Sequence, residues 1–381
     1  MKKSKHIPFN KTTYLGKENN YLSEAIKNEN LAGDGLFTKK CHDWFEKKIG
    51  CEKALLTTSC THAMEIAAIL MDLKPNDEII MPSFTFVSTA NAFVLRGAKV
   101  VFVDIDPNTM NLDENKVYDA INPRTKAIVP IDYAGYSCNI DEINRIAKDN
   151  KLFVMVDSAQ SFMSQYKNKY CGSLSPLAAY SFHATKNITS GGEGGLLLIN
   201  DKKFIHQAEI IREKGTNRSK FLKGKVDKYS WINIGSSYLP SELNAAYLYC
   251  QLKHSETITK SRVNNWNYYY SSFLALAKKE YIQLPPVIKE IEHNGHIFYL
   301  KMKNLIERDR LIKFLKSKDI ITSFHYVPLH SSIAGKRYGK FFGKDVFTTK
   351  ESERLIRLPL FHAITKDQLD KVIDRVHDFF Q

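Results

Sequence analysis

The stretch Phe153-Val154-Met155-Val156-Asp157-Ser158-Ala159-Gln160 decides the fold class of this 381-residue chain. Its apolar residues follow one another without polar alternation, which is typical of a strand buried on both faces of a parallel sheet. The strand ends in an acid, and ligands of open parallel sheets bind at the carboxyl ends of strands. Asp157 is therefore a candidate site residue. Its carboxylate could pair with a protonated pyridine nitrogen, although an N-cap or a structural ion pair fits the same position.

Short apolar runs of the same kind alternate with helix-like segments between about residues 50 and 200. The runs lie at residues 54–56, 78–81, 99–103, 127–131, 152–156, 178–182 and 195–199. Amphipathic stretches such as 61–71 and 141–151 would cover the sheet that these runs form. The alternation predicts an α/β fold, with a mostly parallel central sheet and helices on both faces.

The remainder of the chain predicts a second, smaller unit. Residues 203–214 and 241–280 look helical, and the second of these helices is long enough to bridge two domains. The segments 295–303 and 320–326, with helices at 307–318 and 366–380, suggest a small C-terminal α+β domain. Since the length is more than twice the ~150 residues of one domain, we expect a large domain at 1–250, and a bridging helix with the small domain at 251–381.

Composition argues against several classes of protein. No apolar run approaches the ~18 residues of a membrane span, and no apolar stretch follows the basic N-terminus as in a secretory signal, so we expect a cytoplasmic protein. The six cysteines form no C-x-x-C pair, and neither zinc nor any other metal is expected. The net charge of +14 is dispersed along the chain, which favours solvated faces over a nucleic-acid surface and suits a diphosphate-bearing substrate.

Three further segments carry candidate chemistry after predicted strands. One of them, Thr57-Thr58-Ser59-Cys60-Thr61-His62-Ala63, opens a helix. The free N–H groups at this helix start could bind an anion; alternatively, Ser59 or Thr61 is a plain N-cap. Ser181-Phe182-His183-Ala184-Thr185-Lys186-Asn187 precedes a loop with four glycines, 190–195. A lysine desolvated there has a lowered pKa and can form a Schiff base, whereas an ordinary lysine is exposed and the glycines can serve a tight hairpin. Phe86, in 82–89, could stack on a planar ring or pack in the core.

Motifs of competing chemistries are missing from the sequence. It contains no G-x-x-x-x-G-K-[ST], G-x-S-x-G or H-E-x-x-H, and no G-x-G-x-x-G after the first predicted strand. His325 and His330 lie five residues apart across a proline, a spacing that fixes no helical face for a metal.

Taken together, these segments resemble the DegT/DnrJ/StrS sugar aminotransferases, which are fold type I enzymes dependent on pyridoxal phosphate (PLP). The resemblance runs from 7–9 through 325–330 to 358–360. Within the family it is strongest to transaminases that make dTDP-4-amino-4,6-dideoxygalactose for enterobacterial common antigen, because 212–218 and 235–239 also match them.

The resemblance implies a role for each matching residue. Lys186 would hold PLP and then move a proton between cofactor and substrate. Asp157 would pair with the pyridine nitrogen, and Gln160 would lie near the ring oxygen. The cofactor phosphate would be bound by Ser59, Cys60 and Ser181, the ring would stack on Phe86, and the substrate would meet His325 and Tyr326. Ser237 stands where many members have an Asn that reaches the phosphate of the neighbouring subunit.

The reaction implied is a transamination at C4 of dTDP-4-dehydro-6-deoxy-D-glucose by a homodimer. L-Glutamate would be the amino donor, pyridoxamine phosphate the intermediate form of the cofactor, and the galacto sugar the product. The gluco epimer and amination at C3 of a related keto-sugar are alternatives that no motif excludes. A PLP-binding regulator without turnover is an alternative from another class, against which the complete set of Lys186, Asp157 and Ser181 argues.

Overall fold

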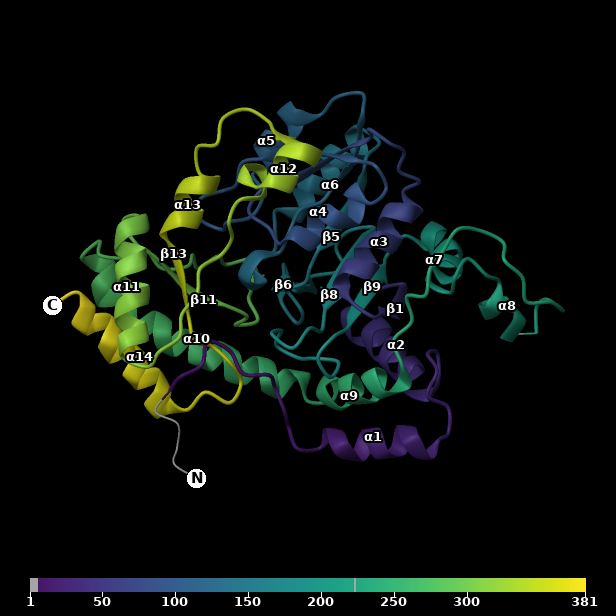
Figure 1. The fold of residues 1–381 in the computed structure, drawn as a ribbon, viewed down its shortest axis with the longest axis horizontal. Coiled ribbons are helices and arrows are strands. Elements are labelled where there is room, and N and C mark those ends of the chain that lie inside the picture. The colour runs from purple at the N-terminus through teal and green to yellow at the C-terminus, as the bar shows by residue number, and fades with distance from the viewer. Residues whose placement is uncertain (1–5, 223) are drawn as a thin grey trace.

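A twisted eight-stranded sheet lies at the centre of the computed structural model, which describes residues 6–222 and 224–381 (Figure 1). Its strand order is β1-β9-β8-β5-β4-β2-β3-β12. The bounds are β1 Lys53–Thr57, β2 Glu78–Pro82, β3 Lys99–Val103, β4 Thr125–Ile128, β5 Phe153–Asp157, β8 Leu177–Ser181, β9 Gly195–Ile199 and β12 Gly339–Phe341. Only β9 runs against its neighbours β1 and β8. The mostly parallel α/β sheet is as predicted, and each predicted run contains or overlaps a strand.

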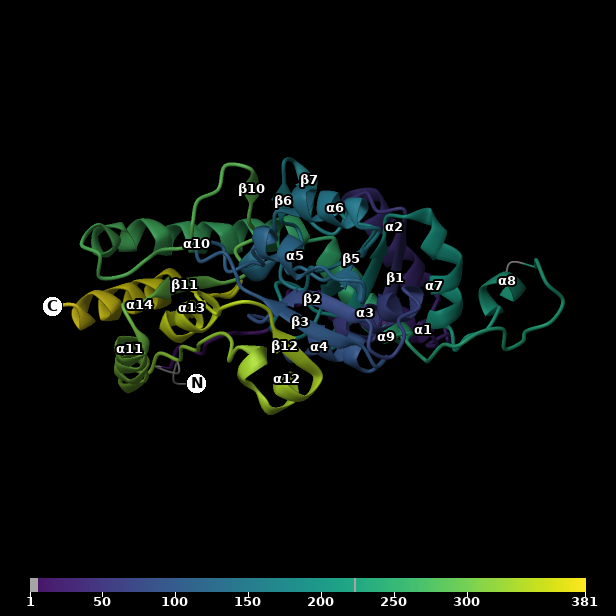
Figure 2. The ribbon, with the colours of Figure 1, turned by 90° about the horizontal axis from the view of Figure 1, so that it is seen from above.

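Helices cover both faces of the sheet, which explains why its strands contain runs of consecutive apolar residues. Leu196 and Leu198 of β9 pack with α2 (Leu36–Ile49), α6 (Ile140–Asp149) and α9 (Glu242–Leu252). Leu197 and Ile199 pack with α3 (Cys60–Leu70), α4 (Val87–Val94) and α7 (Ile205–Arg212) on the opposite face. Figure 2 shows α6 above and α4 below the sheet. With both faces dry, alternation of polar and apolar residues disappears from the strands.

The prediction of one continuous helix at 241–280 is wrong. The chain forms α9 and then α10 (Ser255–Lys278), which runs beneath the sheet toward the C-terminal part in Figure 1. At the junction the His254 ring contacts the carbonyl oxygen of Cys250 at 2.9 Å, and the His254 N–H donates to Gln251 instead. The imidazole thus occupies the Cys250 carbonyl oxygen, to which the His254 N–H would donate in a continuous α-helix.

The C-terminal part has its own core around a two-stranded antiparallel sheet, β11 (Phe298–Lys301) and β13 (Leu355–Leu358). Helices α11 (Leu305–Ser317) and α14 (Lys366–Phe379) cover it, and α13 (Thr348–Arg354) packs on α11, whereas α12 (Ile333–Tyr338) packs on β12 and β3 of the central sheet. The segment 320–326 is not a strand, and only isolated bridges join Ile320 to Ile7 and Ser323 to Arg357. A domain boundary at residue 250 stays a prediction.

The remaining elements are short or peripheral. They are α1 Glu18–Lys27, α5 Glu114–Ala120, α8 Arg218–Leu222, and the strands β6 Gln165–Tyr166, β7 Lys169–Tyr170 and β10 Ile291–Glu292. The six cysteines are buried and free. No helix in the described part of the chain has the length and apolar character needed to cross a bilayer.

The buried carboxylate of Glu242 joins the start of α9 to the start of α2. It accepts hydrogen bonds from the backbone N–H groups of Gly35, Phe37 and Thr38 at 3.1, 2.6 and 3.0 Å, and from the Thr38 hydroxyl. A negative charge at a helix N-terminus is favourable, and bonds to a charged acceptor are stronger than neutral ones. One side chain therefore satisfies the N–H groups that α2 itself leaves free.

We expect Glu242→Gln to lower the free energy of unfolding by about 2–3 kcal/mol, because an amide loses the charge and turns a donor toward other donors. Urea unfolding measures the change. Glu256→Gln is the control, since Glu256 forms an ion pair with Lys48 but is 73% exposed, and it should cost less than about 1 kcal/mol. Equal effects of the two substitutions would contradict the role given to Glu242.

Candidate active site

A cavity of about 710 Å³ opens at the carboxyl ends of β1, β5 and β8. It brings together predicted residues from five separate segments of the chain: Ser59, Cys60, Phe86, Asp157, Gln160, Ser181, Lys186, His325 and Tyr326. Ser237 does not line this cavity. It is exposed and forms an antiparallel bridge with Glu213.

The N-terminus of α3 forms one wall of the cavity. The Ser59 hydroxyl caps the helix by accepting from the His62 N–H at 3.1 Å, as the N-cap interpretation predicts. The backbone N–H groups of Cys60 and Thr61 have no acceptor among the described residues. Free N–H groups and the positive end of a helix dipole together attract an anion. The Ser181 hydroxyl lines the same cavity, so this wall fits a phosphate group.

Gly195 makes this wall possible by lying directly against the start of α3. A Cβ atom at Gly195 would be 2.2 Å from the carbonyl carbon of Ser59 and 2.3 Å from the nitrogen of Cys60. In the sheet, Gly195 pairs with Thr57 on one side and Ser181 on the other. Gly195 therefore lies in close contact with backbone, and no larger residue fits there.

The Asp157 carboxylate is buried without a cation. Oδ2 accepts from the Thr89 hydroxyl at 2.6 Å, and Oδ1 accepts from the Ala159 N–H at 3.1 Å. The described residues offer Asp157 no ion pair within 4 Å, so the structural ion pair considered for this residue is absent there. A buried carboxylate needs a positive partner or several donors. Two donors hold Asp157 in place and leave its charge available to a cationic group in the cavity.

Lys186 reaches the cavity from the loop between β8 and β9. Burial lowers the pKa of its amine, while Cys60 and Asp157 act in the opposite direction and Arg357 lowers the pKa further. No hydrogen bond or ion pair holds its Nζ in the part of the chain that the structure describes. Burial also raises the pKa of the Cys60 thiol well above its ordinary value, so Cys60 stays neutral. A desolvated, untethered amine is suited to Schiff-base formation.

Gln160, Tyr326 and His325 form the opposite wall. Gln160 accepts from the Ala134 N–H at 2.7 Å and donates to the Tyr326 hydroxyl at 2.8 Å. His325 stacks on Tyr326, with ring centroids 3.9 Å apart, and lies 3.2 Å from the Tyr133 hydroxyl. Burial, then the charges of Arg357 and Lys186, hold the pKa of His325 well below its usual range. The ring is therefore neutral near pH 7 and can accept as well as donate a hydrogen bond.

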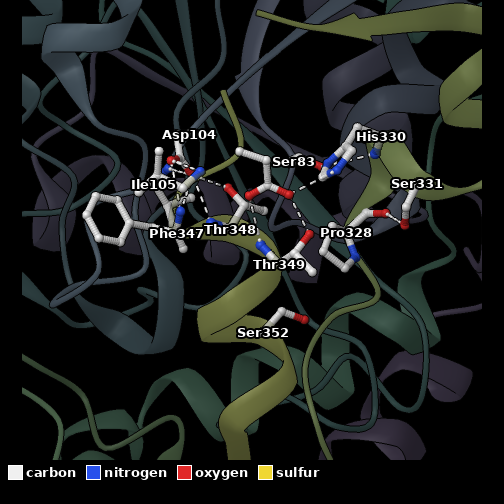
Figure 3. Close-up of polar contacts among 12 residues, drawn as sticks. Ser83, Asp104, Ile105, Pro328, His330, Ser331, Phe347, Thr348, Thr349 and Ser352 are labelled. Atoms are coloured by element: carbon white, nitrogen blue, oxygen red, sulfur yellow. Dashed lines mark hydrogen bonds and ion pairs between the residues drawn. The ribbon is translucent and has the colours of Figure 1, made fainter. Parts of the chain in front are cut away.

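The segment carrying His325 and Tyr326 is fastened by side chains (Figure 3). The Ser83 hydroxyl contacts His330 Nδ1 at 2.7 Å and accepts from the His330 N–H at 3.0 Å. Asp104, at the end of β3, accepts the N–H groups of Phe347 and Thr348. These contacts fix the segment to the carboxyl ends of β2 and β3. His330 thus holds a loop in place through Ser83.

Sequence reasoning missed several residues of the site. Thr89 falls within the segment quoted for Phe86, yet nothing in the sequence indicated its bond to Asp157. Arg357 stands inside the apolar run of β13, and a cation in such a run was a usable signal. Phe9 and His296 also line the cavity. Phe9 belongs to the segment 7–9 that resembles the family, but no role was predicted for it, and nothing in the sequence pointed to His296.

We expect Gly195→Ala to lower the free energy of unfolding by about 1–3 kcal/mol, because the added methyl must displace the peptide between Ser59 and Cys60. Gly343→Ala is the control. Gly343, unlike Gly195, has a left-handed backbone, with φ of 71°, but a Cβ atom there meets nothing within 4 Å. Its cost should stay near about 1 kcal/mol, from the left-handed conformation alone. Thermal denaturation compares the two variants, and an unchanged Gly195→Ala protein would contradict the contact.

Comparisons with known proteins agree with this geometry. The chain is 34% identical over 353 residues to the uncharacterized protein MJ1066 of Methanocaldococcus jannaschii, covering 90% of this chain and 89% of that one. It is 26% identical to the GDP-perosamine synthase of Escherichia coli O157:H7, over 99% of both chains. The PLP form of the putative sugar aminotransferase Spr1654 of Streptococcus pneumoniae shares the fold, with a TM-score of 0.89, 22% identity and 98% coverage of both chains. The model of the DegT/DnrJ/EryC1/StrS aminotransferase family matches residues 14–377, and the chain therefore belongs to that family.

Proposed function

We propose that this aminotransferase uses PLP to aminate the C4 ketone of dTDP-4-dehydro-6-deoxy-D-glucose, with L-glutamate as donor. The product would be dTDP-4-amino-4,6-dideoxygalactose, a precursor of a surface polysaccharide made in the cytoplasm. The observation that carries the proposal is the single cavity in which an untethered lysine, a carboxylate without a cation and a helix N-terminus meet. Membership of the aminotransferase family supports the same cofactor and reaction class.

The residues of the cavity fit the cofactor group by group. The free N–H groups of α3 and the Ser181 hydroxyl would hold the phosphate. Asp157, oriented by Thr89, would pair with the ring nitrogen, and Phe86, whose ring is 56% exposed, would cover one face of the ring. When bound, PLP supplies an electron sink for the carbon that carries the amino group.

Lys186 would act twice in this reaction. Its amine would hold the cofactor in place. When free, the same amine would take a proton from one carbon of the substrate and cofactor pair and return it to another. Burial favours this second role, because the lowered pKa increases the fraction of neutral amine that can accept a proton.

His325 and Tyr326 would contact the sugar. The neutral imidazole and the phenol, whose pKa is raised by burial, offer hydrogen bonds without adding charge near the keto group. Such polar, neutral partners suit sugar hydroxyls. The face of the sugar that receives the proton decides between the galacto and gluco products.

A homodimer would complete the site. Residues 216–222 and 224–235 belong to an arm that projects from the body at α8 (Figure 1). Its exposed apolar side chains include Trp231 at 81% and Ile232 at 48% exposure. Exposed apolar patches of this kind mark interaction surfaces. We infer that the arm packs on a second copy, and that Ser237 at its base reaches the partner's cofactor phosphate.

The purified protein with added PLP should show the visible absorption band of the lysine-bound cofactor, and L-glutamate should bleach it. Lys186→Ala should abolish the band, whereas Lys202→Ala, an exposed lysine, should keep it. A wild-type protein that stays colourless would overturn the proposal. Incubation with glutamate and dTDP-4-dehydro-6-deoxy-D-glucose should give an amino sugar, and NMR of the C4 proton couplings distinguishes galacto from gluco. Bleaching without an amino sugar would reject this acceptor.

Light scattering after gel filtration should give twice the chain mass of 43.7 kDa for the wild-type protein. Trp231→Ser with Ile232→Ser should shift the protein toward monomer, because the arm would lose its apolar contacts. Ile306→Ser is the control, since Ile306 is 72% exposed on α11, away from the arm. A monomeric wild-type protein would refute the dimer.

A further inference from the structure

Arg357 is the one arginine that the described residues place in the site wall, and its position is fixed by backbone bonds. It lies in β13, opposite Tyr299 of β11. On its other edge the Arg357 N–H donates to the Ser323 carbonyl at 2.7 Å, and the Ser323 N–H donates to Arg357 at 3.3 Å. With β11 on one side and the bridge to Ser323 on the other, the side chain can face only the cavity or the core. Arg357 lines the cavity together with Lys186.

The guanidinium of Arg357 is incompletely satisfied. One Nη2 bond goes to the Phe324 carbonyl at 3.0 Å, and the ring of Phe9 lies 4.6 Å from the guanidinium carbon. The Nε atom is buried without an acceptor. The described residues place no carboxylate within ion-pair distance, and burial lowers the pKa of Arg357 with only the phenols of Tyr133 and Tyr326 opposing it.

Arg262 shows what a purely structural buried arginine looks like in this fold. Its Nε donates to Gly295 at 3.1 Å, and its Nη2 donates to His296 and Leu360 at 2.8 and 3.2 Å. Carbonyl oxygens therefore satisfy Arg262 on several sides. Arg357 lacks this arrangement, although leaving a buried charged donor without a partner is costly. The missing partner is an anion that enters the cavity.

We propose that Arg357 binds the α-carboxylate of the amino donor and so selects amino acids over simple amines. This rests on the function proposed above. The α-carboxylate is attached to the reacting carbon, so it must lie near Lys186, and the charge of Arg357 is close enough to lower the pKa of that lysine. The diphosphate of a nucleotide sugar is separated from C4 by the sugar ring. In the second half-reaction the same planar fork can donate to sugar hydroxyls.

The N-terminal segment contributes to this site through Phe9. Ile7 donates to Asp319 at 2.8 Å and accepts from Ile321 at 3.0 Å, which leads the chain toward the cavity. The ring of Phe9 then covers the guanidinium, a contact that is favourable for a desolvated arginine. Phe9 is a positioning residue for Arg357.

The test measures binding and the first half-reaction on the PLP-loaded enzyme. Arg357→Gln should weaken binding of 2-oxoglutarate, which cannot react with this form, by about 10- to 100-fold in calorimetry. The L-glutamate concentration for half-maximal bleaching should rise by a similar factor, and so should that for L-alanine, whose only carboxylate is the α-carboxylate. Binding of dTDP should change less than about threefold. Arg310→Gln is the matched control, because Arg310 is exposed and also lies over a ring, that of Phe379 at 5.8 Å.

Three outcomes would overturn the proposal. They are unchanged 2-oxoglutarate binding, a loss for glutamate but not for alanine, and a loss of dTDP binding equal to that of the acids. Arg357→Met keeps the apolar stem under Phe9 and replaces Arg357→Gln if the latter does not fold, with the same expected losses. A wild-type enzyme that glutamate does not bleach would reject the proposed function instead, so the two failures are distinguishable.

Discussion

The contact on which the site depends is between backbones. Gly195 pairs with Thr57 and Ser181 in the sheet while its Cα packs against the peptide between Ser59 and Cys60. This one residue therefore fixes the position of the N-terminus of α3 relative to the ends of β1 and β8. The free N–H groups of α3 therefore face the same cavity as the Ser181 hydroxyl. The loop that precedes Gly195 brings Lys186 to the edge of this cavity. A side chain at that position would push these parts away from one another.

Three ionisable side chains of the cavity share one property, which is that the described part of the chain leaves each of them incompletely paired. Within the described residues, Asp157 has donors but no cation, whereas Lys186 has no hydrogen bond and Arg357 has an unsatisfied Nε. Groups of this kind lower the stability of a fold that leaves them buried and unpaired. They become favourable when a ligand brings the opposite charges, so their cost to the empty protein is recovered as binding energy. Preorganised groups of this type also need little rearrangement during the reaction.

Much of the fold could be predicted because its signals are local. Strands such as β5 and β9 are continuous apolar runs, and the rule that parallel strands gather their carboxyl ends placed Ser59, Asp157 and Lys186 near one another. The break before α10 was hidden, because it depends on the His254 side chain bonding to the backbone. The strand β12 was also hidden. Its three residues are recognisable only beside β3, from which they are separated by more than two hundred positions in the chain. Contacts such as Thr89 with Asp157 likewise exist only after folding.

The pairing of β1 with the distant strand β9 has a consequence for how the newly synthesised chain folds. β1 is an edge strand whose only partner in the sheet is β9. Residues 53–57 therefore leave the ribosome long before residues 195–199 exist to pair with them. Pairings so distant along the chain slow folding, since a long loop must close before the contact forms. Until β9 is synthesised, the apolar strand β1 stays unpaired. The nascent chain is therefore exposed to aggregation until Gly195, the last residue that the phosphate wall needs, has been made.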